Sequence, residues 1–142
     1  MTQDNAMAGF VVVTHGNLAN ELIAAAEMIV GKMKNVRAVA ISSSSSPEKS
    51  REDIIQAIDA VDNGGGAIIL TDLFGGTPSN LSISFLEEKK LEVVTGVNLP
   101  MMIKLSSIRE KMDLDEMARF IKSYGRENIT VAGELLKGEA TS

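Results

Sequence analysis

The chain alternates short apolar runs with longer stretches in which apolar residues recur every three or four positions. Short β-branched runs predict buried parallel strands, and the longer pattern predicts amphipathic helices. The predicted strands are Phe10–Val13, Val36–Ile41, Ala67–Leu70, Leu91–Thr95 and a short last one at Ile129–Ala132. The predicted helices are about Leu18–Val30, Pro47–Asp62, Pro78–Glu88, Met101–Ile108 and a segment that begins after Asp113 and ends at Gly125.

Residues at the ends of these segments are typical helix caps. Asn17 is expected to cap the first helix and Gly31 to end it. Ser46 and Thr77 each precede a proline, which is typical of an N-cap followed by the first helical turn. Asp113 stands three residues before a glutamate, which is the spacing of a capping box.

Alternating strands and helices predict an open, mostly parallel, doubly wound α/β sheet with helices on both faces. We expect the strand order 2-1-3-4, in which the first and third strands are neighbours. Residues 1–8 are expected to be a disordered lead, residues 9–135 a single domain and residues 136–142 a weak tail.

The single histidine of the chain, His15, directly follows the first predicted strand, and Asp72 follows the third. Ligands of such sheets bind at the carboxyl ends of the strands. In the order 2-1-3-4 the two side chains would meet, and Asp72 would orient one ring nitrogen. The other nitrogen would be free to act as a base, a metal ligand or a nucleophile. If the fourth strand lay between the first and third, this pairing would fail.

The residues around this pair favour an anion. Gly16 lets backbone approach closely, Thr14 and Thr77 add hydroxyl donors, and two helix N-termini should face the crevice. Neither motif contains lysine or arginine, so backbone N–H groups and hydroxyls would hold a phosphoryl group. We therefore expect phosphate-binding groups at Thr77, Gly16, Thr14 and Gly76.

Composition narrows the function. The net charge of −5 and the lack of a basic run argue against nucleic acid or an anionic membrane as the main partner. The chain has no cysteine and one histidine, which excludes thiol catalysis, cysteine-ligated zinc and sites with several imidazole ligands. A carboxylate-rich magnesium site stays open on composition alone, but we assign no residue to a metal and expect no cofactor. No apolar run approaches the ~18 residues of a membrane span, and residues 1–8 do not resemble a signal peptide. We therefore expect a cytoplasmic protein without direct membrane insertion.

Several separated segments, spanning about residues 9–128, resemble one family. The segments are Val13–Gly16, Ala26–Gly31, Thr71–Asn80, Thr95–Met101 and Gly125–Glu127. They are similar to the enzyme IIA component of the mannose/fructose/sorbose family of the bacterial phosphoenolpyruvate-dependent sugar phosphotransferase system.

The resemblance implies that His15 accepts a phosphoryl group on Nε2 from the phosphohistidine of the carrier protein HPr. His15 would then pass it to a histidine of a IIB component in sugar uptake. Asp72 would accept a hydrogen bond from Nδ1–H, and Thr77 would bind phosphoryl oxygens. The family is a homodimer that exchanges its last strand, which fits Ile129–Ala132. Where the family commonly has an apolar–Pro–Gly–Glu-like loop, this chain has Ser42–Ser46, a difference that bears on the partner surface.

Three other functions compete with this one. A regulatory phosphoprotein of the same system would use the same His15 chemistry without moving sugar. A receiver-like domain phosphorylated on Asp72 would need acidic magnesium ligands after the first strand, where Thr14 and His15 stand. An acid–base enzyme or nucleotide binder is disfavoured because the chain has neither a phosphate-loop lysine nor a G-x-G-x-x-G motif after the first strand.

Overall fold

The computed structural model describes residues 7–108 and 112–138. The described part is built around a parallel four-stranded sheet in the order β2-β1-β3-β4, as predicted. The strands are β1 (Gly9–His15), β2 (Val36–Ile41), β3 (Ala67–Thr71) and β4 (Leu91–Thr95).

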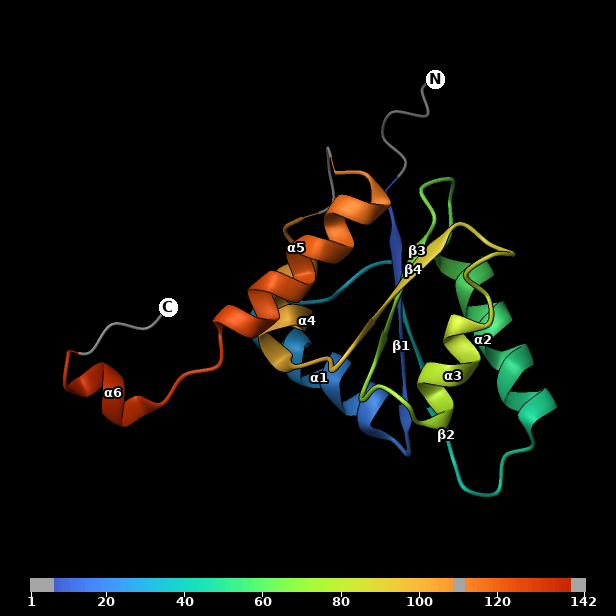
Figure 1. Cartoon of the computed structure of the whole chain (residues 1–142). Helices are drawn as coiled ribbons and strands as arrows, with labels where there is room; N and C mark the ends of the chain where they lie inside the picture. The colour runs from blue at the N-terminus through green and yellow to red at the C-terminus, as the bar shows by residue number, and fades with distance from the viewer. Residues whose placement is uncertain (1–6, 109–111, 139–142) are drawn as a thin grey trace.

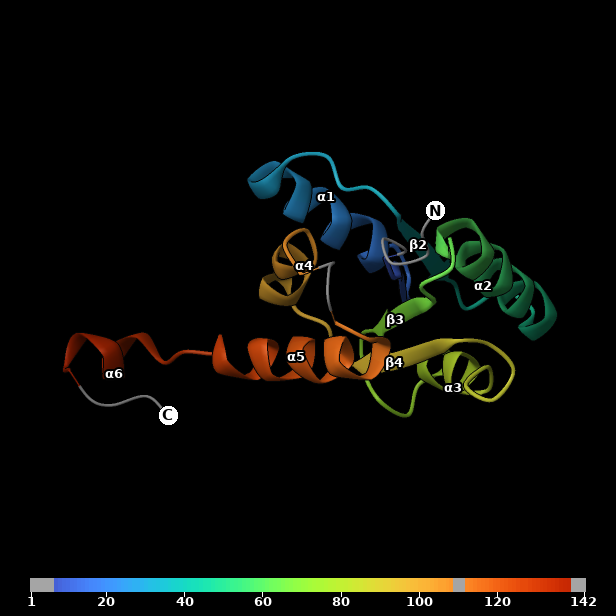
Figure 2. The same cartoon turned by 90° about the horizontal axis from the view of Figure 1, so that it is seen from above.

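Helices cover both faces of the sheet, so the fold is the expected doubly wound α/β arrangement (Figures 1 and 2). One face carries α1 (Leu18–Val30), α4 (Leu99–Leu105) and α5 (Leu114–Glu127). The opposite face carries α2 (Pro47–Val61) and α3 (Thr77–Ile83). The last helix, α6 (Ala132–Leu136), lies away from the sheet in both views.

Burial on both faces explains the unbroken apolar run of β1. Phe10 and Val12 pack into the core beneath α1, α4 and α5, whereas Val11 and Val13 pack beneath α2. All four side chains are fully buried. A strand buried on both faces needs no polar alternation, which is why its residues are apolar throughout. This central position brings the carboxyl end of β1 to the middle of the sheet edge.

The third and fourth helices have boundaries that differ from the prediction. The third helix ends at Ile83 rather than near Glu88, because the chain leaves the helix at Ser84 and buries Phe85 in the core instead. The Ser84 hydroxyl donates to the Leu81 carbonyl at 2.6 Å, a local bond of the kind that competes with helix continuation. The fourth helix begins at Leu99 rather than Met101 and ends at Leu105 rather than Ile108.

The sequence predicted that α5 ends at Gly125, but the helix continues to Glu127 and Gly125 lies buried inside it. A Cβ at this position would lie 2.7 Å from Met101 Cγ, so the missing side chain lets α5 approach α4 closely. The predicted capping box at the start of the helix is confirmed: Glu116 N–H donates to Asp113 Oδ1 at 2.8 Å, and Asp113 N–H donates to Glu116 Oε1 at 3.1 Å.

The predicted last strand at 129–132 is wrong for this single chain. Residues 129–131 have no regular structure, α6 begins at Ala132, and Ile129 and Val131 are exposed. A strand needs a neighbouring edge for its backbone hydrogen bonds, and this segment runs away from the sheet (Figure 1). Exchange of this segment between subunits stays a prediction.

Both chain ends fall partly outside the described residues. Residues 1–6 of the predicted disordered lead and residues 139–142 of the predicted tail are among those not described. Within the lead, Ala8 is buried against the core rather than disordered, which is a correction.

Candidate functional site

His15 and Asp72 meet at the carboxyl edge of the sheet, as the predicted strand order requires. His15 is the last residue of β1, and Asp72 directly follows β3. The two strands pair directly, with Val13 opposite Thr71. The His15 side chain is 52% exposed and that of Asp72 is 12% exposed. The ring is thus held at the surface by a carboxylate that is largely covered.

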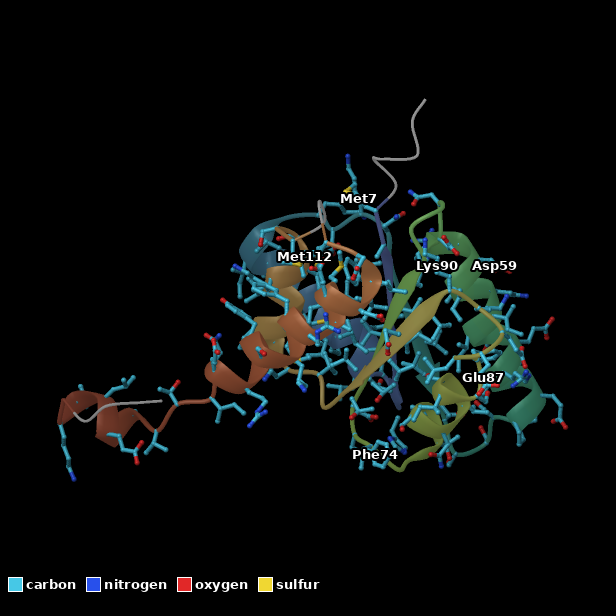
Figure 3. The ribbon with its side chains drawn as sticks, turned by 45° about the horizontal axis from the view of Figure 1, so that its top comes forward. Met7, Asp59, Phe74, Glu87, Lys90 and Met112 are labelled. Carbon is cyan, nitrogen blue, oxygen red and sulfur yellow. The ribbon has the colours of Figure 1, made fainter. Side chains whose placement is uncertain are left out.

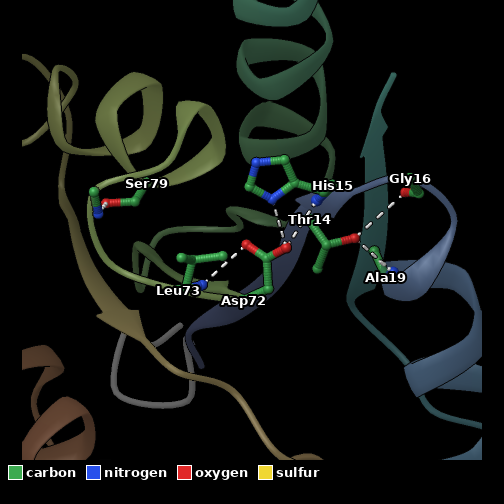
Figure 4. A network of polar contacts seen from close by, with 8 residues as sticks. Thr14, His15, Gly16, Ala19, Asp72, Leu73 and Ser79 are labelled. Carbon is green, nitrogen blue, oxygen red and sulfur yellow. Dashed lines mark hydrogen bonds and ion pairs between the residues drawn. The ribbon is translucent and has the colours of Figure 1, made fainter. Parts of the chain in front are cut away.

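Asp72 contacts His15 at two points (Figure 4). Its Oδ2 accepts a hydrogen bond from the His15 backbone N–H at 2.9 Å and lies 2.8 Å from ring atom Nδ1. Its Oδ1 accepts from the Leu73 N–H at 3.0 Å. An ionised carboxylate only accepts hydrogen bonds, so Nδ1 carries the proton and Nε2 keeps its lone pair.

The same contacts keep Asp72 ionised. Partial burial alone would raise the pKa of its carboxyl group. The hydrogen bonds from the His15 backbone and ring, attraction to the ring, and the Leu73 N–H together outweigh this effect and hold the pKa of Asp72 below its ordinary value. The carboxylate is therefore a fixed negative charge beside the ring.

Gly76 lies against the other side of the imidazole. A Cβ on Gly76 would stand 2.8 Å from His15 Cε1 and 3.3 Å from Nε2. Its φ of −86° is open to any residue, so space rather than backbone conformation favours glycine here. Gly76 is also the N-cap of α3, and Thr77 is the first helical residue rather than the predicted cap. The missing side chain of Gly76 thus lets the start of α3 lie close to the free ring nitrogen.

Thr14 does not offer its hydroxyl to a phosphoryl group as predicted. Its side chain is fully buried, where Oγ1 accepts from the Ala19 N–H at 2.8 Å and donates to the Gly16 carbonyl at 3.4 Å. Thr14 thus takes the capping role predicted for Asn17, whose side chain makes no cap bond. Gly16 is exposed and adopts φ +57°, so this turn favours glycine.

A cavity of about 540 Å³ opens beside the ring. His15, Gly16 and Thr77 line one part of it, and residues of the Ser42–Ser46 loop line another. The cavity also includes Ser50, which sequence reasoning did not single out. The available signal was a small polar residue one turn before Ile54, on the apolar face of α2.

Exposed apolar side chains lie next to the site. Leu73 is 51% and Phe74 is 74% exposed, on the loop that follows Asp72. Figure 3 shows Phe74 at one end of the molecule and Met7 at the other. In the sequence, these two residues stand out only as part of the Thr71–Asn80 segment. An exposed apolar pair beside an exposed histidine is typical of a surface that contacts another protein.

Two further features of the described residues bear on the chemistry. Within residues 7–108 and 112–138, no cluster of three or more histidine or acidic side chains is arranged to hold a metal ion. Over the same ranges, none of the helices combines the length and the apolar character needed to cross a membrane.

Comparisons with known proteins agree with this geometry. Residues 9–122 match the family model described as "PTS system fructose IIA component". The chain is 28% identical over 137 residues to the fructose-specific EIIA component of Bacillus subtilis (strain 168), covering 96% of this chain and 94% of that relative. It is 30% identical over 125 residues to the mannose-specific EIIAB component of Escherichia coli (strain K12), covering 84% of this chain but only 38% of that relative.

Solved structures show the same fold. The mannose/sorbose-specific IIA subunit of the phosphotransferase system from Enterococcus faecalis matches with a TM-score of 0.79 and 26% identity, covering 87% of this chain and 93% of that one. The PTS IIA protein associated with the fucose utilization operon of Streptococcus pneumoniae matches with a TM-score of 0.77 and 28% identity, covering 95% and 99%. The chain belongs to the mannose/fructose/sorbose family of enzyme IIA components of the phosphotransferase system.

Proposed function

We propose that this protein is a phosphocarrier in sugar uptake, a protein-histidine phosphotransferase. His15 accepts a phosphoryl group from phosphorylated HPr on Nε2 and passes it to a IIB component. The observation that carries the proposal is the half-exposed imidazole whose Nδ1 is 2.8 Å from Asp72 Oδ2. A ring anchored through one nitrogen presents the other to solvent in a defined direction.

In the proposed transfer, the lone pair of His15 Nε2 forms a bond to the phosphorus atom. The bond from phosphorus to the donor imidazole breaks, and its electron pair stays on the donor nitrogen. Because Nδ1 keeps its proton, the phosphorylated His15 ring carries a positive charge, and the donor ring loses one. The step therefore moves one phosphoryl group and one unit of ring charge without net proton transfer.

Asp72 lowers the free energy of the phosphorylated state. Its negative charge faces the ring nitrogen on which positive charge develops, and both contacts to His15 exist before phosphorylation. Proteins catalyse phosphoryl transfer mainly by positioning the groups and stabilising charge. A preformed carboxylate stabilises charge with little reorganisation. The lowered pKa of Asp72 keeps that charge present at neutral pH.

Around Nε2, the proposed phosphate-binding groups are Thr77, Gly16 and Gly76. Thr77 and Gly16 line the cavity beside the ring, and Gly76 brings backbone to the edge of the ring. The exposed position of His15 lets two partners reach the same nitrogen in turn, and Leu73 and Phe74 supply apolar area for docking. Alignment of two imidazoles across one phosphorus atom contributes much of the rate.

The relay is tested in two stages with purified proteins. Phosphoenolpyruvate, enzyme I and HPr should place acid-labile label on the wild-type protein but not on His15→Ala, and an added IIB component should then remove the label. Label retained by His15→Ala would refute the assignment of His15. Label that forms normally but is drained by no IIB component would favour the regulatory alternative over sugar uptake.

A further inference from the structure

Ser50 is a buried polar residue that has no role in the relay proposed above. It lies in the first turns of α2, where its backbone N–H donates to the Ser46 carbonyl at 3.0 Å. The residue is only 4% exposed, yet it lines the same cavity as His15 and Thr77. Among the described residues, its hydroxyl bonds no other residue, but it is not sealed in the core, because Thr71 Oγ1 is the one fully buried side-chain atom there without a partner.

Because it is not sealed in the core and Ser50 lines the cavity, this hydroxyl can bond water and exchange that water for a ligand. The neighbouring serines, by contrast, bond other residues: the Ser42 hydroxyl bonds that of Ser45 at 2.9 Å, and the Ser46 hydroxyl accepts from the Lys49 N–H at 3.1 Å. Ser50 is thus a hydroxyl donor at the wall of the cavity that bonds no other described residue.

We propose that Ser50 donates a hydrogen bond to the phosphoryl group carried by His15, as a second hydroxyl besides Thr77. This inference rests on the proposed function and extends it to α2. Ser50 and Thr77 come from different helices and border one cavity with the ring. A phosphoryl group has three oxygens, so donors on two sides restrict its rotation as well as stabilise its charge.

The start of α2 fixes the position of Ser50 in the free protein. It stands at the start of α2, whose N-cap Ser46 and first-turn proline fix the direction of the helix. The next turn is anchored by Ile54, which is fully buried. Ser50 is therefore fixed by the core on one side and borders the cavity on the other.

The first test uses the exchange equilibrium between phospho-HPr and this protein. Ser50→Ala should still be labelled on His15, but the equilibrium should shift toward phospho-HPr by about tenfold, since a hydrogen bond to a charged group is lost. Ser50→Thr keeps a hydroxyl and should restore most of the effect. Ser44→Ala is the matched control, because Ser44 is exposed and does not line the cavity. An unchanged equilibrium in Ser50→Ala would overturn the proposal.

The second test does not depend on HPr. Potassium phosphoramidate phosphorylates histidine chemically, and the ³¹P resonance of the product reports its hydrogen bonds. The resonance should move in Ser50→Ala and stay in place in Ser44→Ala; no movement in either would overturn the role of Ser50. If HPr fails to label the wild type while this resonance still responds to Ser50→Ala, the relay fails and the Ser50 contact stands.

Unfolding temperature separates this role from a structural one. Removing a hydroxyl that bonds no other described residue should leave the unphosphorylated Ser50→Ala protein as stable as the wild type or slightly more stable. The stabilisation that phosphorylation adds should shrink in the same variant. A large loss of stability in the unphosphorylated variant, with the phosphorylation effect intact, would show that the hydroxyl serves the fold alone.

Discussion

One carboxylate oxygen, Oδ2 of Asp72, holds both the backbone and the ring of His15. The two bonds, at 2.9 Å and 2.8 Å, join residues 57 positions apart in the sequence. They fix where the imidazole stands and which nitrogen is free. At the scale of the residue, the chemistry therefore depends on this pair more than on any other contact.

Asp72→Asn is expected to slow phosphoryl acceptance by on the order of 100-fold or more. The amide has nearly the shape of the carboxylate but no charge, and its NH₂ group can donate to Nδ1 and leave the proton on Nε2. Rapid-quench mixing with labelled phospho-HPr measures the rate of label transfer to this protein. Glu134→Gln, an exposed change on α6, is the control; equal rates in Asp72→Asn and the wild type would remove Asp72 from the mechanism.

The lowered pKa of Asp72 also predicts how stability changes with acid. A carboxyl group whose pKa is lower in the folded state stabilises the fold fully above its ordinary pKa of 3.8. That contribution is lost as the pH falls through the lowered folded value. Denaturant unfolding of the wild type below pH ~4 should therefore show a fall in stability that is smaller in Asp72→Asn. Parallel curves for the two proteins would contradict this.

The pairing of His15 with Asp72 could be predicted from sequence because it depends only on strand order and on which residue ends each strand. The fate of Thr14 could not. Whether its hydroxyl faces the crevice or caps α1 depends on the path of the turn at Gly16, which the sequence pattern leaves undetermined. The involvement of Ser50 likewise depends on how α2 packs, and a lone serine gives no signal of that.

Among the helices and strands, the start of α3 lies directly against the His15 ring. Gly76 caps this helix and leaves room for the ring where a side chain would touch Nε2. Strands and the long helices followed their apolar patterns closely, since burial on a regular face fixes the period. The ends of α3 and α5 did not, because local serine bonds and a glycine packed on Met101 decide them.

Gly76→Ala is expected to reduce phosphoryl acceptance at least tenfold while the protein stays folded. The backbone at Gly76 tolerates any residue, so the effect comes from the methyl group beside Nε2. Circular dichroism checks the fold and labelling from phospho-HPr checks the rate. Gly133→Ala, where a methyl group meets no atom within 4 Å, is the matched control. Normal labelling of Gly76→Ala would show that the ring does not need this space.

At the scale of the whole molecule, the described segment after α5 is exposed in the single chain. It presents four exposed apolar side chains away from the sheet, namely Ile129, Val131, Leu135 and Leu136. In the described residues, β4 is an edge strand whose outer side pairs with nothing. An apolar segment and an open edge on the same chain are what strand exchange between two copies would use.

We therefore expect a homodimer at micromolar concentration in sedimentation experiments. Ile129→Asp combined with Val131→Asp should shift the protein toward monomer, because charge would enter the predicted interface. Phe74→Asp is the matched control, since Phe74 and Ile129 are each 74% exposed and Phe74 lies beside the site instead. A wild-type monomer would count against exchange, and dimers that survive the double change would place the interface elsewhere.

The most direct test of the account is to identify the phosphorylated atom. The protein is labelled through phosphoenolpyruvate, enzyme I and HPr, and ¹⁵N and ³¹P NMR then locate the phosphorus. The account predicts phosphorus bonded to Nε2 of His15, with the proton still on Nδ1. Phosphorus on Nδ1, or on the carboxylate of Asp72, would contradict it.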